Sequence, residues 1–591
     1  MNTYALFAET IAQIVHRSGR AGFIVPTGIA TDDSAKAYFQ AISQGGRLVS
    51  LYDFENREGI FPGVHRSFKF CLLTLGRVDS SEFGFYFTRP EQLADERRRF
   101  TLTREDFQRI NPNTGTCPVF RSVRDAELAK AIYSRVPVFV REARGGQAEE
   151  NPWGVRFTAM FHMSNDSHLF ATSPDNNRLP LYEAKMIHHY DHRWATYVEK
   201  DGRETTEDVP LASKHDPEFA VTPRYWVEAR EVFLRTARLP KTLLGALREG
   251  DREKLILALA HLLFGNWLLA RGPGESRDVM RELYPAWEDF VDQFPFARRL
   301  PPAALGLCGD NPPSLEPQGP AYLPAEAVSA VNTTGRTQAA WYAAEEESVQ
   351  ALPSVARTFP VDSGESASKQ AEDVYEMANY CLETTAPDWY IGFRNITNAT
   401  NERTVIASVV PRAGAGNNLP LLFFEKDIGS ELIAALVANL SALVLDFVGR
   451  HKIGGTNLNF FIARQLPVLP PTAYTKDDLL FIAPRVLELT CTASDLDLWG
   501  KEFSDRPAIY RFDPDRRTRL QAELDAYYAR LYGLSRDELR YVLDPVDVMG
   551  DDYPSETFRV LRQREEKACG EYRTQRLVLE AWDALESGKL H

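Results

Sequence analysis

The stretch from Gly19 to Leu75 constrains the fold more than any other part of the chain. Residues 22–26 form a short apolar run that ends at a proline, which is typical of a strand buried on both faces. Residues 32–34 are good helix starters, and the apolar runs 48–54 and 68–75 predict two further strands. The order is therefore strand, helix, strand, loop, strand.

The connection between the last two predicted strands indicates their relative direction. It contains Gly59, Pro62 and Gly63, and such a segment is a poor crossover helix. Because parallel neighbours need a crossover, we expect these two strands to be antiparallel. Phe85–Phe87 should extend the edge of the sheet. The pattern is that of the far edge of a doubly wound α/β sheet.

The same stretch resembles the second half of the catalytic domain of N6-adenine DNA methyltransferases. That family has a Gly-rich turn before a strand closed by proline, and later an [IV]-F-P-x-V segment, here Gly19–Pro26 and Ile60–Val64. It looks closest to the large methyltransferases of type IIG restriction systems and of BREX- or DISARM-like phage defence. The resemblance implies that Phe61 packs against the extruded adenine, since flipping a base costs its stacking. From the residues alone, Phe61 could equally be a core side chain before a tight turn.

The family places two signatures ahead of this stretch, and neither precedes it here. One is a Gly-rich loop for S-adenosylmethionine, and the other is an Asn-Pro-Pro-aromatic motif that receives the target base. The single Asn-Pro-Pro, at 311–313, is followed by Ser314 within a Pro- and Gly-rich linker, 309–324. We therefore expect a three-stranded half-sheet with an unpaired apolar edge. A separate chain or an upstream segment would supply the missing half and most of the S-adenosylmethionine site.

Composition excludes several classes of protein. At 591 residues the chain is long enough for two to four domains, and no apolar run approaches the roughly 20 residues of a membrane span. Six scattered cysteines without CxxC spacing argue for reduced thiols, a cytoplasmic location and no zinc site. The net charge of −14 weighs against a simple nucleic-acid binder, although only the binding face must be positive.

Residues 150–235 resemble the start of the family's target-recognition domain. The family version opens on Tyr-Glu-Gly-Lys-Met, and this chain has Ala184 in place of the glycine. The surrounding segment, 181–197, is dense in His, Tyr, Trp, Lys and Arg. Such a mixture suits double-stranded DNA, with cations for phosphates and aromatics or amides for base edges. Two other interpretations remain open: a metal site at His188, His189 and His192, which lacks accompanying motifs, and a buried polar strand with satisfied histidines.

Residues 376–475 return to the resemblance. Residues 389–411 predict strand, polar loop and strand, in the manner of type I and type IIG specificity elements, and 450–461 carry Gly-Gly-Thr-Asn. Glycine pairs allow close approach to a phosphate or adenine edge, but the same residues could form a turn that faces water. The polar loop 111–121 could contact the DNA backbone or act as a structural staple. The residues expected to contact DNA are Asn113, Lys185, His189, Arg193, Arg224, Arg394, Arg403, Lys452, Thr456, Asn457 and Asn459.

Helix predictions complete the picture. An amphipathic helix over 2–17 should turn Phe7, Ile11 and Ile14 toward a core, and an exposed charged helix is expected over 95–100. The remaining patterns predict long helices over 432–448 and 562–585.

The expected fold is α/β, with a partial Rossmann-like methyltransferase sheet at the N-terminus, an α+β target-recognition domain and a helical C-terminal region. The expected domains are the catalytic half (1–145), the first recognition part (146–235), a helical insertion and linker (236–325), the second recognition part (326–475) and the helical region (476–591). The resemblance implies the DNA-recognition and partial catalytic subunit of an adenine-specific DNA methyltransferase, with a partner that carries the Asn-Pro-Pro-aromatic motif and further defence-system proteins as possible associates. The alternatives are a non-catalytic specificity subunit and an inactive remnant.

Overall fold

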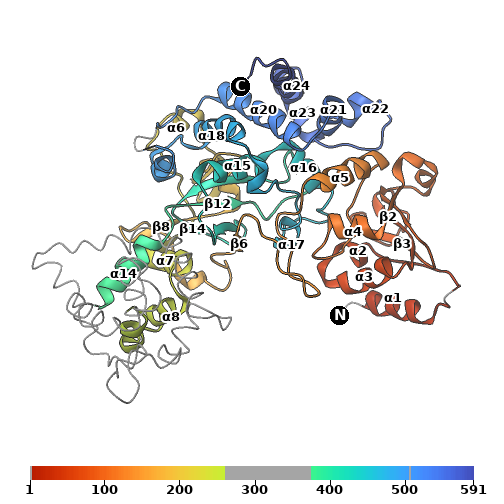
Figure 1. Cartoon of the computed structure of the whole chain (residues 1–591), viewed down its shortest axis with the longest axis horizontal. Helices are drawn as coiled ribbons and strands as arrows, with labels where there is room; N and C mark the ends of the chain where they lie inside the picture. The colour runs from red at the N-terminus through yellow and green to blue at the C-terminus, as the bar shows by residue number, and fades with distance from the viewer. Residues whose placement is uncertain (1–2, 17, 260–373, 505–507, 591) are drawn as a thin grey trace, which may run out of the picture.

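The computed structural model describes residues 3–16, 18–259, 374–504 and 508–590. The N-terminal sheet and its helices lie at one end of the molecule, and the C-terminal helices run along the top (Figure 1). The helices α7 (Ala229–Thr236), α8 (Lys241–Glu249) and α14 (Val374–Thr385) lie at the opposite end. Most of the predicted insertion and linker, including the Asn-Pro-Pro at 311–313, lies outside the described residues.

Five strands form the N-terminal sheet, in the order β1-β3-β2-β4-β5. They are β1 (Ala21–Pro26), β2 (Leu48–Glu55), β3 (Lys69–Leu75), β4 (Ser81–Phe87) and β5 (Phe100–Leu102). β3 lies between β1 and β2 and runs antiparallel to both, so β1 and β2 are parallel to each other. β4 is parallel to β2, and β5 is antiparallel to β4. The three predicted strands, the antiparallel last pair and the extension by Phe85–Phe87, which is part of β4, are confirmed, and β5 is the one strand of this sheet that was not expected.

Aromatic side chains join the helices to this sheet. The helices are α2 (Gly28–Thr31), α3 (Lys36–Gln44), α4 (Arg104–Ile110) and α5 (Val123–Arg135). The ring of Phe107 on α4 lies 5.7 Å from that of Phe39 on α3 and 5.8 Å from that of Phe83 on β4. The charged helix expected over 95–100 is wrong: a short 3-10 turn at Glu96–Arg98 leads into β5. Strand pairing prevails there because Phe100 is buried against β4.

One edge of the sheet is open. Among the described strands β1 pairs only with β3, and its residue Ile24 is 54% exposed. The helix α1 (Thr3–Ile14) lies against β1, and Ile11 packs against the core as predicted. The prediction is wrong for Phe7 and Ile14, which are 68% and 76% exposed. The small residues Ala8 and Ala12 pack inward instead. Apolar side chains therefore surround an unpaired strand edge, an arrangement that favours association.

The middle of the chain builds two four-stranded sheets and a hairpin. One sheet has the order β13-β12-β15-β6, and the other β14-β8-β11-β7. The strands are β6 (Val155–Thr158), β7 (Phe170–Ala171), β8 (Arg178–Tyr182), β11 (Trp226–Glu228), β12 (Trp389–Phe393), β13 (Ala407–Pro411), β14 (Gly414–Ala415) and β15 (Leu421–Phe424), with β9 (Ala195–Lys200) and β10 (Arg203–Asp208) as the hairpin. Because β6 pairs with β15 and β8 with β14, the sequences before and after residues 260–373 share both sheets. We call residues 146–235 and 374–475 the recognition region.

Helices dominate the rest of the chain, as predicted. They are α15 (Ser430–Ser441), α16 (Leu443–Arg450), α17 (Phe460–Ala463), α18 (Lys476–Thr490), α19 (Asp497–Lys501), α20 (Pro514–Leu531), α21 (Arg536–Leu543), α22 (Pro545–Met549), α23 (Arg559–Cys569) and α24 (Arg573–Glu586). The single helix expected over 432–448 is wrong, because Ala442 is extended (ψ 140°) and the chain bends by 50° between α15 and α16. The helix expected over 562–585 is also divided, because Gly570 adopts φ 78° and ends α23.

No single helix in the described ranges has the length and apolar character needed to cross a membrane. Only α15 and α16 taken together, across their bend, reach that length and composition.

Candidate functional site

The loop after β2 carries Phe61 and is held by one buried side chain. The Nδ2 group of Asn56, which is 0% exposed, donates to the carbonyl oxygens of Phe61 (3.0 Å) and Val64 (2.8 Å). Its Oδ1 atom accepts from the Phe61 N–H (2.9 Å). Gly59 supplies the left-handed turn, with φ 74°. Asn56 therefore fixes the backbone on which Phe61 stands. Asn56 was not predicted from the sequence; an asparagine directly after an apolar strand is a common turn residue, which was the available signal.

The ring of Phe61 is partly exposed and packs against a stacked pair of phenylalanine rings. Its edge packs against Phe70, with the ring centroids 4.9 Å apart, and Phe70 stacks on Phe54 at 5.5 Å. Phe61 is 37% exposed, and Val64 and Phe68 of the same loop are 42% and 60% exposed. A rigidly mounted ring with a free face can pack against another planar group. The contact of Phe61 with an extruded adenine stays a prediction.

The polar loop after β12 and the Gly-Gly-Thr-Asn turn lie beside α2, the helix that follows β1. The Thr397 N–H donates to the carbonyl of Thr456 (3.0 Å), which joins the polar loop after β12 to the Gly-Gly-Thr-Asn turn. Gly454 lies next to Thr31 of α2, where an added Cβ would be 3.7 Å from the Thr31 Cβ atom. Thr456 is exposed and Asn457 partly exposed. The structure therefore brings this turn to the carboxyl end of β1, where α2 begins.

Two residues predicted to contact DNA lie inside the fold, which corrects that interpretation. Arg193 is 0% exposed, and its guanidinium donates to the carbonyls of Asp216 (2.8 Å) and Thr492 (2.9 Å). His189 is 5% exposed, and its Nε2 atom donates to the carbonyl of Val405 (2.8 Å). Burial and the charge of Arg403 hold the pKa of His189 well below its usual value. These side chains satisfy interior carbonyl groups, so the alternative of a buried polar segment with satisfied histidines describes them.

Two more predicted cations are bound within the fold. The guanidinium of Arg403 donates to the carboxylate of the fully buried Asp446 (2.6 Å). The ammonium of Lys452 donates to the carbonyl of Ile110 (2.6 Å) and to Oδ1 of Asn111, and burial holds its pKa well below its usual value. Because Lys452 ties the recognition region to the loop after α4, its observed contacts are structural.

The remaining predicted residues divide into bound and exposed groups. The amide of Asn113 donates to the carbonyl of Val140 (2.9 Å), which favours the staple interpretation of its loop, and Arg394 donates to the carbonyl of Ile187. Lys185 and Arg224 are exposed on the recognition region and form surface ion pairs. Asn459 is exposed as well. Lys185, Arg224, Thr456, Asn457 and Asn459 thus remain candidates for DNA contact.

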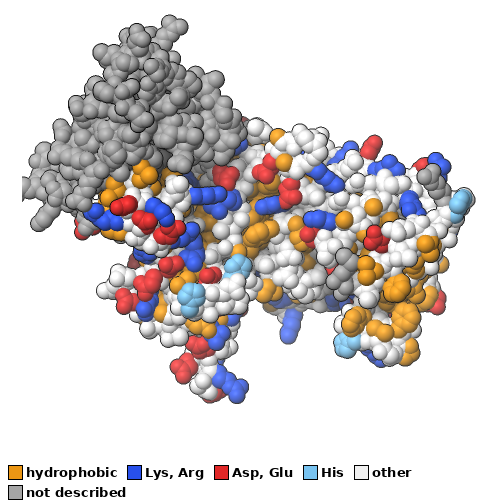
Figure 2. Space-filling model, turned by 90° about the horizontal axis from the view of Figure 1, so that it is seen from below, with side chains coloured by type: hydrophobic (Ala, Val, Ile, Leu, Met, Phe, Trp, Pro, Cys, Tyr) orange, Lys and Arg blue, Asp and Glu red, His pale blue; other side chains and the backbone are white. Residues whose placement is uncertain are grey.

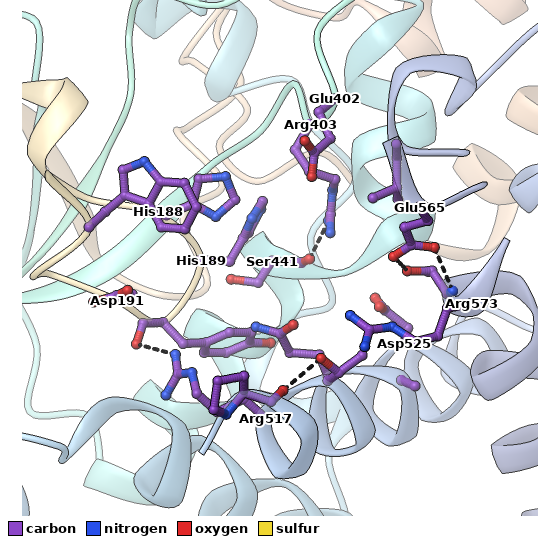
Figure 3. A pocket seen from close by; sticks show the side chains of 18 of the residues that line it. His188, His189, Asp191, Glu402, Arg403, Ser441, Arg517, Asp525, Glu565 and Arg573 are labelled. Carbon is purple, nitrogen blue, oxygen red and sulfur yellow. Dashed lines mark hydrogen bonds between the residues drawn. The ribbon is translucent and has the colours of Figure 1, made fainter. Parts of the chain in front are cut away.

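A pocket of about 340 Å³ opens where the recognition region meets α20, α23 and α24 (Figure 3). The segment His188–Trp194, which the sequence singled out for its density of aromatic and polar residues, forms one wall. Arg517 and Asp525 of α20 form the facing wall, and Glu565 and Arg573 lie at the side. We call this the inner pocket. One wall of the pocket was visible in the sequence, but the pocket was not, because apart from Lys214 its other residues lie more than 200 positions further along the chain.

Burial shifts the pKa of two side chains in the inner pocket, His188 and Asp525. His188 stacks on Trp194 with the ring centroids 4.4 Å apart, and burial, with the charges of Arg394 and Arg403, lowers its pKa to about 3. Asp525 accepts from the Leu443 N–H (2.8 Å), and burial raises the pKa of its carboxyl group to about 6. Such groups exchange hydrogen bonds with a ligand without a large change of charge. No group of three or more His, Cys, Asp or Glu side chains suited to a metal ion occurs among the described residues.

Comparisons with known proteins gave structural similarity alone. No family model matches the sequence, and no curated protein matches it. The chain is similar to the type IIG restriction endonuclease BpuSI, with 11% identity over 92% of this chain and a TM-score of 0.23. It is also similar to the type IIL restriction-modification enzyme MmeI, solved in complex with DNA, with 10% identity over 90% of this chain and a TM-score of 0.30. The chain spans about half, 49%, of each of these proteins, and at such low scores we draw no functional conclusion from them.

Proposed function

We propose that this chain is the DNA-recognition and partial catalytic portion of an adenine-specific (N6) DNA methyltransferase of a restriction–modification or phage-defence system. In this proposal a complementary polypeptide segment, on another chain or on the same one, completes the N-terminal sheet. That segment binds most of the S-adenosylmethionine and carries the Asn-Pro-Pro-aromatic motif. The motif resemblance in Gly19–Val64 supports the proposal, and the arrangement of β1, β3 and β2 agrees with it.

The open edge of β1 is the observation that carries the proposal. Hydrophobic side chains gather on the end of the molecule that holds the N-terminal sheet (Figure 2). The exposed apolar residues of α1 and β1 include Leu6, Phe7, Ile14 and Ile24, each at least 47% exposed. Proteins usually cover or charge such an edge, because its free N–H and C=O groups accept another strand. A partner that adds a strand and covers α1 would pair the backbone groups of β1 and bury the exposed apolar side chains.

The described residues do not fit a complete S-adenosylmethionine site. The junction of β1 with α2 is the place where a doubly wound sheet would offer a ligand site. There the buried carboxylate of Asp53 accepts from the Thr27 hydroxyl and the Tyr86 N–H, so it is directed into the protein. Its pKa is raised by burial. The proposal therefore assigns the cofactor site to the complementary segment.

Phe61 and the Gly-Gly-Thr-Asn turn would form this chain's share of the site. Phe61 would pack against the extruded adenine, and Asn56 would hold its backbone in place. Thr456 and Asn457, close to α2, would contact the DNA next to the target base. The methyl transfer itself would use groups of the complementary segment.

Reconstitution tests the proposal. The chain is co-expressed with a polypeptide that carries an Asn-Pro-Pro-aromatic motif, such as the product of a neighbouring gene, and adenine methylation of plasmid DNA is measured. We expect co-purification and methylation only with both components present. Phe61→Ala should lower the methylation rate at least about tenfold without loss of the complex, because one stacking partner of the base is removed.

Phe68→Ala is the matched control, because Phe68 lies on the same loop and is more exposed than Phe61. It should retain most of the rate. Equal methylation by the Phe61→Ala and wild-type complexes would contradict the role of Phe61. Failure of the two components to associate would contradict the proposed function.

A further inference from the structure

The inner pocket continues into a second cavity. A groove of about 580 Å³ runs between α20 and α24, and we call it the outer groove. Thr518, Ala522 and Arg573 line both cavities. A ligand held beside these three residues would contact both spaces. Each volume lies within the range of 300–1,000 Å³ typical of small-molecule sites.

The inner pocket offers a flat surface and a free acceptor. His188 and Trp194 line the inner pocket and stack with an interplanar angle of 30°, and the Lys214 ammonium lies 5.1 Å from the centroid of the Trp194 ring. Asp525 is 8% exposed, and only one of its carboxylate oxygens, Oδ1, has a hydrogen-bond partner among the described residues. A planar ring that carries N–H groups would stack on the aromatic faces and donate to the second oxygen.

The outer groove is lined by basic side chains with spare donors. Arg519 and Lys589 are exposed and form no ion pair with other described residues. Arg573, at the junction of the two cavities, has an Nε–H group that is buried without an acceptor. Its guanidinium lies 3.7 Å from the carboxylate of the exposed Asp515. These donors suit an anionic group with several oxygens.

Two of the acidic residues of the outer groove are paired with arginines, Glu523 with one outside the groove and Glu580 with one within it. Glu523 pairs with Arg485 at 2.7 Å, and Glu580 pairs with Arg576 at 2.9 Å. Asp515 is 83% exposed at its side chain and points to water. The groove thus keeps a net attraction for a small anion, although the chain as a whole carries a charge of −14.

We propose that the inner pocket and the outer groove together form a binding site for a free nucleotide, which is independent of the methyltransferase proposal. The base stacks on the His188–Trp194 pair and donates an N–H to Asp525. The phosphate lies at Arg573, between the inner pocket and the outer groove, within reach of Arg519. A nucleotide is a ligand class that joins a planar N–H-bearing ring to a phosphate.

Calorimetric titration of the full chain tests the proposal. The probes are the 5′-monophosphates of adenosine, guanosine, cytidine and uridine, the four nucleosides, inorganic phosphate and a trinucleotide of DNA. We expect at least one monophosphate to bind, its nucleoside to bind at least about tenfold more weakly, and phosphate alone to give no saturable heat. No binding by any monophosphate would overturn the proposal, as would a tenfold preference for the trinucleotide.

Variants then locate the site. Asp525→Asn and Arg573→Gln should each weaken binding of the monophosphate about tenfold or more, since each removes a charge-assisted hydrogen bond. Arg573→Gln should leave the weaker binding of the nucleoside unchanged, because the base does not reach Arg573. The matched control is Arg516→Gln, since Arg516 lies on α20 but pairs with Glu488 outside both cavities.

Thermal unfolding of each variant shows whether it is folded. Arg519→Gln is a second variant of the phosphate site, and it changes an exposed residue instead of a partly buried one. Unchanged affinity in both Arg573→Gln and Arg519→Gln would place the nucleotide elsewhere and overturn the proposal.

Discussion

The N-terminal sheet and the recognition region reverse the usual relation between polarity and burial. At the sheet, the apolar face of α1 points to solvent, with Phe7 68% exposed. In the recognition region, Arg193 and His189 are buried and bound to backbone carbonyls. Apolar residues are usually inside, and cations are rarely buried unless they are paired. The first region therefore lacks a covering surface, whereas the second has an interior organised by polar groups.

The difference shows what each set of residues can contribute. A buried guanidinium that holds three parts of the chain together is a structural group, and its removal should act on stability. An exposed apolar face contributes little to the stability of the chain alone, and its removal should act on association. The following predictions test the two regions in these terms, from the largest expected effect to the smallest.

Arg193→Ala should lower the free energy of unfolding by about 4 kcal/mol, because several buried carbonyl groups lose their donor. Urea unfolding followed by circular dichroism measures this change. Arg224→Ala is the control, since the exposed Arg224 forms a surface ion pair with Glu204 and lies over the Tyr225 ring but donates to no buried carbonyl among the described residues. It should change stability by less than about 0.5 kcal/mol. Similar effects of the two substitutions would refute the structural role of Arg193.

The inner pocket should make stability depend on pH through Asp525. Its pKa is raised by burial to about 6, whereas the unfolded chain has the ordinary value near 4. Between these values the unfolded state loses its proton first, so the free energy of unfolding falls as the pH rises, by up to about 3 kcal/mol. Unfolding measured from pH 4 to 7 should show this decrease in the wild type but not in Asp525→Asn. A parallel decrease in both would contradict the assignment.

Asn56→Ala should lower the free energy of unfolding by about 2 kcal/mol, because three hydrogen bonds to the loop are lost. Urea midpoints measure the change, and limited proteolysis should show faster cleavage within residues 57–68. Ser67→Ala serves as the control on the same loop, since the Ser67 side chain is exposed and contacts only the imidazole of His65. Equal cleavage of all three proteins would show that Asn56 does not hold the loop.

Phe7→Ser should have the smallest effect on the chain alone, less than about 0.5 kcal/mol, because the side chain is mostly exposed. The same substitution should abolish or strongly weaken co-purification with the complementary segment. Leu480→Ser on α18 is the control, since Leu480 is 69% exposed but far from β1 in the sequence and on a different helix. Normal association of Phe7→Ser would remove α1 from the interface.

Local sequence patterns predicted the strands of the N-terminal sheet, because short apolar runs such as 22–26 and 48–54 favour a strand. The expected burial of 22–26 on both faces is wrong, because β1 lies at the edge of the sheet and Ile24 is 54% exposed. They did not predict the break at Gly570 or the bend at Ala442, where one residue leaves the helical conformation within an otherwise helical pattern. Nor could they place Arg193, because its carbonyl partners are up to 299 residues away. Amino-acid type suggested DNA contact, whereas burial, which depends on the whole fold, decided against it.

The most direct measurement is a calorimetric titration of S-adenosylmethionine into the chain alone and into the chain combined with its complementary segment. The account predicts no saturable binding by the chain alone and stoichiometric binding by the combination. Tight binding of S-adenosylmethionine by residues 1–591 alone would show that the N-terminal sheet is already complete, and would contradict the central claim.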